Sequence, residues 1–299
     1  MFRKLVVKII LLAERLRRRF FTFHTRPMFG YESRYNGKEN AWDSQCAIII
    51  QGGLKRDNDF TLESVKLYHR HYPSATIILS TWKGEDVSGF EPFLGERFLI
   101  LQSTKPSIPG PHNINMQIVS TKTGIDKAVE KGFLYVLKTR ADQRLYGIET
   151  LRFMRNLLNF FPVKGQTSQK QRMVSTASGT SKVWAYHFSD LVMFGNALDM
   201  QKYWEVNLTE TSSIKGFVPE QYLLTQYLAK TGWEVKDTLD DFMGALGARC
   251  IIVDNEAIDA YWPKYAAIWR EYRLKNYFSP RLEINFKTWL NEAYIPAKQ

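Results

Sequence analysis

The feature that most constrains the fold is an alternation of short, unbroken apolar runs with segments of helical length. The apolar runs are "CAIIIQGG" (46–53), "ATIILSTW" (75–82), "RFLILQ" (97–102) and "FLYVLK" (133–138), and helix-length segments occupy 60–72 and 113–131. Strands without a polar face must be covered on both sides, and the intervening helices supply that cover. The sequence therefore predicts an α/β fold with a mostly parallel central sheet flanked by helices.

The second half of the chain is less regular. We expect a helix over 148–160, strands near "RMVSTA" (172–177) and "VWAYHFSDLVMFG" (183–195), a helix over 219–230, and a strand at "CIIV" (250–253). Both cysteines lie in apolar runs, which favours buried thiols in a reducing compartment over a disulfide. Residues 30–299 are predicted to form a single domain, ending in a helical tail over 256–299.

The formal charge of +11 is concentrated near the amino terminus. Residues 1–30 hold eight of the basic side chains and one acidic one, which leaves only about +4 for the rest of the chain. Proteins that bind nucleic acid usually carry cations across the folded surface beside stacking aromatics, and no such pattern is present. We therefore expect no nucleic acid partner.

Residues 1–29 are predicted to form a basic amphipathic helix. At ~100° per residue the apolar side chains fall on one third of the helix, and basic side chains fall opposite. The apolar positions are Phe2, Leu5, Val6, Ile9, Leu12, Ala13, Leu16, Phe20 and Phe23, and the basic ones are Lys4, Lys8, Arg15, Arg18 and Arg19. The apolar run is too short to span a bilayer, so an anionic membrane surface is the expected partner, with packing on the protein's own body as the alternative.

A group of charges follows the strand predicted at 133–138. The stretch "YVLKTRADQRLYG" places Lys138, Arg140, Asp142 and Arg144 within seven residues. In open α/β sheets, ligands bind beyond the carboxyl ends of the strands. A carboxylate there can hold a cation, and arginines can bind phosphate with paired hydrogen bonds. The stretch is thus interpreted as a nucleotide diphosphate site, against the alternative of a salt-bridged loop.

Several segments, taken in order, resemble the WavE family of lipopolysaccharide-synthesis proteins and, more distantly, GT-A type glycosyltransferases. They are "IIIQGG", "FTLESVKLYHRHYPSATIILSTW", "NINMQIVSTKTGIDKAVEKGFLYVLKTRADQRL", "FSDLVMFG" and "VPEQYLLTQYL", which together cover about residues 46–260. The resemblance implies a GT-A-like fold and transfer of a sugar from a nucleotide donor. It also implies a donor half at 46–147 and an acceptor half at 148–260.

In GT-A enzymes a D-x-D sequence at the end of a central strand binds a metal ion and the donor diphosphate. Here that position reads Arg140-Ala141-Asp142, so Asp142 is the single matching metal candidate. Two alternatives follow from this departure. Either one carboxylate holds Mg²⁺ or Mn²⁺, or Arg140 itself offsets the phosphate charge.

Other donor-binding candidates lie at the ends of strands and at a helix start. The glycine turn would let the backbone approach a nucleoside, residues ending the second strand would contact base or ribose, and asparagines would face the donor sugar or merely cap a helix. They are Gln51, Gly52 and Gly53; Ser80, Thr81 and Trp82; and Asn113 and Asn115.

Candidates for the acceptor side come from the second half of the chain. Ser189 and Asp190 interrupt an apolar run, where a carboxylate needs a partner or a cleft, and His187 precedes them. By resemblance His187, Ser189 and Asp190 would bind the acceptor. Glu220, in the first turn of a predicted helix, is the candidate catalytic base beside Asp190, because a sugar hydroxyl is a weak nucleophile; otherwise Glu220 only complements the helix dipole.

Together these features predict a glycosyltransferase that acts on a glycolipid or saccharide acceptor of lipopolysaccharide or capsule. We expect it to be peripheral on the cytoplasmic face of the membrane, with a nucleotide-sugar donor. Two alternatives stay open. One is another transferase of phosphate chemistry on a similar sheet, and the other is a non-catalytic assembly subunit in which the D-x-D sequence has decayed.

Overall fold

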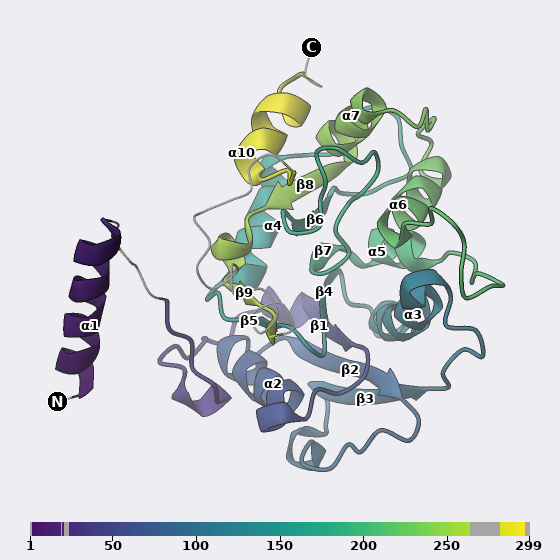
Figure 1. Ribbon diagram of the computed structural model, residues 1–299. Coiled ribbons are helices and arrows are strands. Elements are labelled where there is room, and N and C mark those ends of the chain that lie inside the picture. The colour runs from purple at the N-terminus through teal and green to yellow at the C-terminus, as the bar shows by residue number, and fades with distance from the viewer. Residues whose placement is uncertain (1, 19, 21–23, 264–281, 297–299) are drawn as a thin grey trace.

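The computed structural model describes residues 2–18, 20, 24–263 and 282–296 (Figure 1). Its centre is a seven-stranded sheet in the order β3-β2-β1-β4-β7-β6-β8. The strands are β1 (Cys46–Gln51), β2 (Thr76–Trp82), β3 (Phe98–Ser103), β4 (Tyr135–Arg140), β6 (Met173–Thr176), β7 (Met193–Asn196) and β8 (Cys250–Val253). All strand pairs of this sheet are parallel except those that β7 makes with β4 and β6. The predicted α/β class with a mostly parallel sheet is confirmed.

Helices lie on both sides of this sheet. Figure 1 shows α2 (Phe60–His71) and α4 (Thr150–Phe160) on one side, with α3 (Ile114–Glu130), α5 (Ala197–Trp204) and α6 (Pro219–Lys230) on the other. The chain then continues through α7 (Leu239–Arg249) into β8. β1 and β2 are buried along their whole length, as strands covered on both faces must be.

The close approach of α3 to β1 depends on one glycine. A Cβ atom added at Gly124 would lie 2.5 Å from Cγ2 of Ile49 in β1. At this distance atoms overlap, so a side chain at position 124 would push the helix away from the strand. Glycine at position 124 thus allows α3 to pack closely against β1.

The prediction of a strand over 183–195 is wrong for most of that range. Only Met193–Asn196 forms a strand, and residues 183–192 are turns and loop in which Tyr186 has a left-handed φ of 57°. The apolar character of the run reflects burial of Tyr186 and Phe188, not pairing in a sheet. A short apolar run cannot by itself distinguish a strand from a buried loop.

A small ribbon outside the main sheet is not evident from the sequence. β5 (Arg144–Leu145) pairs antiparallel with β9 (Ala260–Tyr261), which brings the segment after β4 beside the tail. The described part of the tail also contains a 3-10 turn at Asn255–Ile258, α10 (Phe286–Thr288) and a π-helix at Trp289–Tyr294.

The amino-terminal helix α1 spans Phe2–Arg17, so the predicted helix ends before Phe20, while Arg19 and Phe23 lie outside the described residues. Its apolar side chains are exposed: Leu5 is 57% exposed, Leu12 59% and Leu16 76%. Among the helices described, none combines the length and the apolarity that crossing a bilayer requires.

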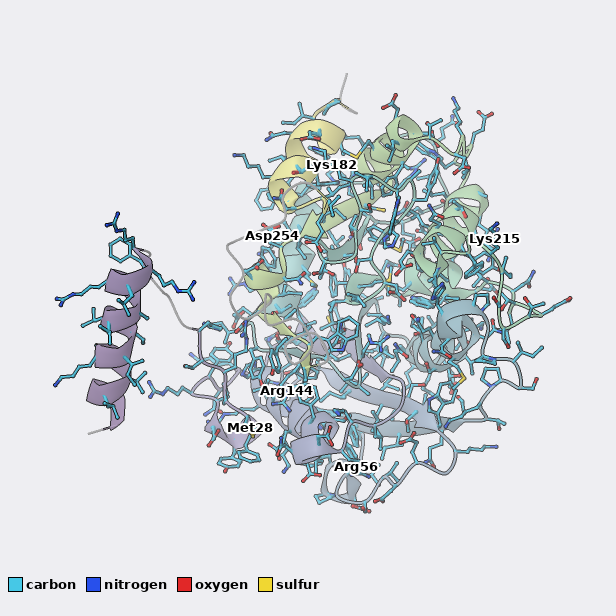
Figure 2. The ribbon with its side chains drawn as sticks, viewed as in Figure 1. Met28, Arg56, Arg144, Lys182, Lys215 and Asp254 are labelled. Carbon is cyan, nitrogen blue, oxygen red and sulfur yellow. The ribbon has the colours of Figure 1, made fainter. Side chains whose placement is uncertain are left out.

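The segment after α1 is bound tightly to the domain. Arg144 Nη1 donates to the carbonyl of Met28 at 2.7 Å, and Figure 2 labels both residues. Tyr146 donates to the carbonyl of Pro27 at 2.8 Å, and Arg26 Nε donates to Asp259 at 2.6 Å. We call residues 24–33 the strap. The strap therefore contacts residues that lie in or next to each strand of the β5–β9 ribbon.

Candidate functional site

A cleft of about 1310 Å³ opens along the carboxyl ends of β1 and β4. Gln51 and Arg140, the last residues of these strands, are direct partners in the sheet, so the turns that follow them lie side by side. The cleft continues past the ends of β6 and β7 to the start of α6. One cavity thus joins the end of the sheet expected to bind the donor to the region expected to bind the acceptor.

The turn that follows β4 forms one wall of the cleft and is rigidly held. The amide of Ala141 donates to the carbonyl of Gln51 at 2.9 Å, and Thr61 at the start of α2 donates to the carbonyl of Ala141 at 2.8 Å. Gln143 donates back to the carbonyl of Arg140 at 3.0 Å. These bonds fix the backbone from which Arg140 and Asp142 project.

Arg140 and Asp142 form an ion pair that lines the cleft. Arg140 Nε donates to Asp142 Oδ1 at 2.8 Å, and Nη2 donates to Oδ2 at 3.2 Å. Trp262, just after β9, donates its indole N–H to Asp142 Oδ2 at 3.0 Å, and its ring lies 5.0 Å from the Arg140 guanidinium carbon. Burial opposes ionisation of Asp142, but hydrogen bonds and charge from Arg140 outweigh it, and the pKa of Asp142 is lowered.

The surroundings of Asp142 do not fit a metal site. A carboxylate offers about four lone-pair positions, and the bonds from Arg140 and Trp262 take three of them. In the described part of the chain, no group of three His, Cys, Asp or Glu side chains is arranged to hold a metal ion. The predicted Mg²⁺ or Mn²⁺ at Asp142 therefore gains no support from this geometry.

Lys138 precedes Arg140 by two residues in β4, so the two side chains lie on the same face of the strand. Its ammonium group is fully buried, donates to the carbonyl of Asp190, and lies 4.9 Å from the ring centre of Trp204. Burial lowers the pKa of Lys138 to about 8, although the negative charge of Asp190 acts in the opposite direction. Lys138 thus places a titratable cation behind the cleft wall.

Two carboxylates and a histidine meet at the far end of the cleft. Glu220 lies in the first turn of α6, and its Oε2 is 3.8 Å from His187 Nε2. His187 Nδ1 lies 2.7 Å from the carbonyl of Gly179; since a carbonyl only accepts, this nitrogen carries a proton. Burial and the nearby charge of Asp190 raise the pKa of Glu220, which favours a proton-accepting role near neutral pH.

Four residues that line the cleft carry a buried acceptor oxygen with no donor among the described residues. These oxygens are Oδ2 of Asp190, Oε1 of Gln117, Oε1 of Gln143 and Oδ1 of Asn255. A buried acceptor without a donor costs free energy, so such atoms indicate a ligand or water that donates to them. A polyhydroxyl ligand such as a sugar supplies donors of this kind.

Comparison with known families adds an independent finding. A family model described as WavE lipopolysaccharide synthesis matches residues 46–239, which is more than half of the chain. The protein belongs to the WavE family. No curated protein matched the chain.

Membership of the WavE family indicates a role in lipopolysaccharide synthesis. The matched range contains β1 through α6, and with them most of the cleft wall, including both the Arg140–Asp142 pair and Glu220. Trp262, Asn255 and the strap lie outside it. The likeness to GT-A enzymes is consistent with the mostly parallel sheet of this WavE protein.

Ten of the residues singled out from the sequence line the cleft of the WavE protein. Gly52 follows β1 with φ of 105°, a conformation that glycine adopts without strain, and Asn113 has a left-handed φ of 62°. Gln51 accepts a hydrogen bond from Ser120 of α3 at 2.7 Å, which fixes its amide. The ten are Gln51, Gly52, Gly53, Trp82, Asn113, Arg140, Asp142, His187, Asp190 and Glu220.

The other six predicted residues are almost fully buried and do not line the cleft. Asn115 ties two loops together, because its amide nitrogen donates to the carbonyls of Ile108 and Thr209. Arg144 binds the strap and the carbonyl of Phe60. The six are Ser80, Thr81, Asn115, Lys138, Arg144 and Ser189.

Sequence reasoning missed several residues of the cleft wall. Trp262 lies beyond the recognised segments, and only the pairing of β9 with β5 brings it to Asp142. Gln143 is adjacent to Asp142 and Arg144, and Gln117 is two residues from Asn115, yet an isolated glutamine carries no sequence signal. A helix of period 3.6 starting at Asn113 does place position 117 on the same face, which is the one hint that was available.

Proposed function

We propose that this WavE protein is a glycosyltransferase that moves a sugar from a nucleotide-sugar donor to a lipid-linked or lipopolysaccharide saccharide. The observation that carries the proposal is that one cleft is lined both by Arg140 and Asp142 and by Asp190 and Glu220. Family membership supports the pathway, and the unsatisfied acceptor oxygens in the cleft support a sugar as ligand.

The donor is proposed to bind over the turns that follow β1 and β4. Gly52 and Gly53 leave room for the backbone to approach a nucleoside, and Trp82 borders the same part of the cleft. Arg140 lies across from this turn, where it would donate hydrogen bonds to the diphosphate. The sugar would then extend toward Asp190.

Glu220 is proposed to act as the catalytic base. Its carboxylate takes the proton of an acceptor hydroxyl, whose oxygen forms a bond to the anomeric carbon while the bond from that carbon to the diphosphate oxygen breaks. The nucleoside diphosphate leaves with the electron pair of the broken bond. Asp190, whose Oδ2 lacks a partner among the described residues, would accept a hydrogen bond from a sugar hydroxyl nearby.

The membrane surface is proposed as the place of action. The apolar side of α1 is exposed rather than packed on the domain, and Lys8, Arg15 and Arg17 on the same helix are exposed as well. An amphipathic helix of this kind lies in the interface of an anionic leaflet. An enzyme held there remains close to an acceptor that is confined to the same leaflet.

Incubation with radiolabelled nucleotide sugars and lipid extract tests the proposed reaction. We expect label from the sugar, and not from the nucleotide phosphate, to reach the lipid fraction. Label from the phosphate would instead indicate a transferase of phosphate chemistry. A protein that binds no nucleotide and transfers no label would support the non-catalytic assembly subunit.

Co-sedimentation with vesicles tests the membrane part. Wild-type protein should bind vesicles containing phosphatidylglycerol, and a protein lacking residues 2–24 should not. A matched variant, Leu5→Ser with Leu12→Ser, keeps every charge of α1 and should also lose most binding. Equal sedimentation of all three proteins would contradict the anchoring role of α1.

A further inference from the structure

We infer that Arg140 is the cation that binds the donor diphosphate, and that Asp142 is a positioning residue for Arg140 rather than a metal ligand. The inference rests on the proposed function and specifies how its donor is held. It predicts binding of nucleoside diphosphates without any divalent ion.

Both carboxylate oxygens of Asp142 accept hydrogen bonds, two from the guanidinium of Arg140 and one from Trp262. The distances from Arg140 Nε, Arg140 Nη2 and Trp262 Nε1 to these oxygens are 2.8, 3.2 and 3.0 Å. A paired arrangement of this kind fixes the plane of a guanidinium group. A metal ion at the same carboxylate would have to displace these donors and would bring a positive charge against Arg140.

Trp262 adds a second constraint on the same group. Its ring lies 5.0 Å from the guanidinium carbon, within the range of a cation–π contact, while its N–H holds the carboxylate. Trp262 therefore contacts both members of the ion pair. Such support is expected around a binding group whose orientation matters, because a fixed guanidinium loses less conformational freedom when a phosphate binds.

Arg140 is the cation of β4 that lines the cleft. Lys138 lies on the same face of β4, but it is buried and donates to the carbonyl of Asp190. Lys55, in the turn after β1, lines the cleft on the side expected to hold the nucleotide, and its ammonium group is paired with Asp57. Arg140 is therefore the side chain of this strand that is placed to donate to a diphosphate in the cleft.

Calorimetric titration of the full-length protein with UDP, CDP, GDP and ADP tests the inference. Each nucleotide is titrated in EDTA, in Mg²⁺ and in Mn²⁺. We expect at least one nucleotide to bind with an affinity that changes less than about threefold between these buffers, a difference below ~0.7 kcal/mol. Binding that requires Mg²⁺ or Mn²⁺ would overturn the inference and leave the proposed function standing. No binding in any buffer would overturn both.

Variants of the pair separate the two roles. Arg140→Ala should weaken metal-free binding about 10- to 100-fold, the usual effect of losing hydrogen bonds to a charged group. Arg140→Lys should restore part of the affinity because it keeps the charge. Trp262→Phe keeps the ring but removes the N–H, so a loss of only a few-fold is expected from a positioning contact.

Arg140→Asp gives the most direct contrast. This variant carries the D-x-D arrangement, so it should lose metal-free binding and gain binding that depends on Mn²⁺. Asp142→Asn should retain measurable metal-free binding, since the amide oxygen still accepts from Arg140 or Trp262. Unchanged metal-free affinity in Arg140→Ala, with thermal unfolding like that of the wild type, would show that Arg140 is not the phosphate ligand.

Discussion

Replacement of Lys138 by methionine tests whether burial of this charged side chain in the sheet lowers the free energy of unfolding. The pKa of this lysine is ordinarily 10.5 and burial lowers it to about 8, so the folded protein releases this proton at a lower pH than the unfolded chain does. Methionine has a similar length and no charge. The variant therefore removes the titration and keeps most of the packing against Trp204.

The expected pH dependence follows from proton counting. Between pH 8 and 10.5 the unfolded chain binds more protons at this site than the folded protein, so the free energy of unfolding rises with pH in this window. Each pH unit contributes ~1.4 kcal/mol. From pH 7 to pH 9.5, the wild type should thus gain about 2 kcal/mol relative to Lys138→Met.

Urea denaturation of both proteins between pH 7 and 9.5 measures this difference. Buried tyrosines and cysteines titrate over part of the same range, but their contributions cancel when the two proteins are compared. The groups facing the ammonium are Asp190, Arg140, Asp142 and Glu220, and none of them ordinarily titrates between pH 7 and 9.5. A stability difference that stays constant with pH would refute the argument that burial lowers the pKa of Lys138.

Three further substitutions test other parts of the structure. Glu220→Gln should lower the transfer rate about 10²- to 10⁴-fold while the affinity for nucleotide stays unchanged. The wild-type rate should begin to fall on acidification at a higher pH than an ordinary glutamate would give, because the pKa of Glu220 is raised. Full activity of the variant would show that Glu220 is not the catalytic base. Arg144→Ala removes the hydrogen bonds from the guanidinium to the carbonyls of Met28 and Phe60 and to the hydroxyls of Ser64 and Tyr146, and should cost about 3 kcal/mol in urea denaturation; an unchanged midpoint would show that these bonds contribute little. Gly124→Ala forces a methyl group toward Ile49 and should destabilise by about 1–3 kcal/mol in the same assay. Gly244→Ala is the contrast, because a Cβ atom added at this helical glycine of α7 would lie 3.7 Å from Trp233, an ordinary contact distance; equal losses would mean that contact with β1 is not the cause.

Local patterns were sufficient for the parallel half of the fold. The apolar runs that became β1, β2 and β4 are predicted as strands in an α/β chain, because each is too short for a helix and has a helical segment before or after it. The turn after β4 could be recognised as part of the site for the same reason. Its position follows from the strand alone.

The acceptor half could not be predicted as well, because its contacts join distant segments. Asp190 lies in a loop whose apolar neighbours imitate a strand, and Trp262 reaches the site only through the β5–β9 ribbon. Arg144 was singled out for its charge, yet its guanidinium donates to the carbonyls of Met28 and Phe60, which lie 116 and 84 positions away in the sequence. Sequence patterns report local periodicity and not which distant group a long side chain will contact.

The attachment of the strap limits the distance between the end of α1 and the folded domain. From the end of α1 at Arg17 to His24, which contacts Asp259 at 2.9 Å, there are only seven residues, and an extended chain of that length covers at most ~25 Å. For the proposed membrane-bound transferase, so short a connection would favour glycans whose growing end is still near the lipid, because the ends of long polymers would extend beyond the cleft. Inserting a Gly-Ser segment after Arg18 should therefore broaden the range of acceptor lengths that are elongated on vesicles. An unaltered distribution of product lengths would show that the length of the connecting segment does not determine which acceptors are used.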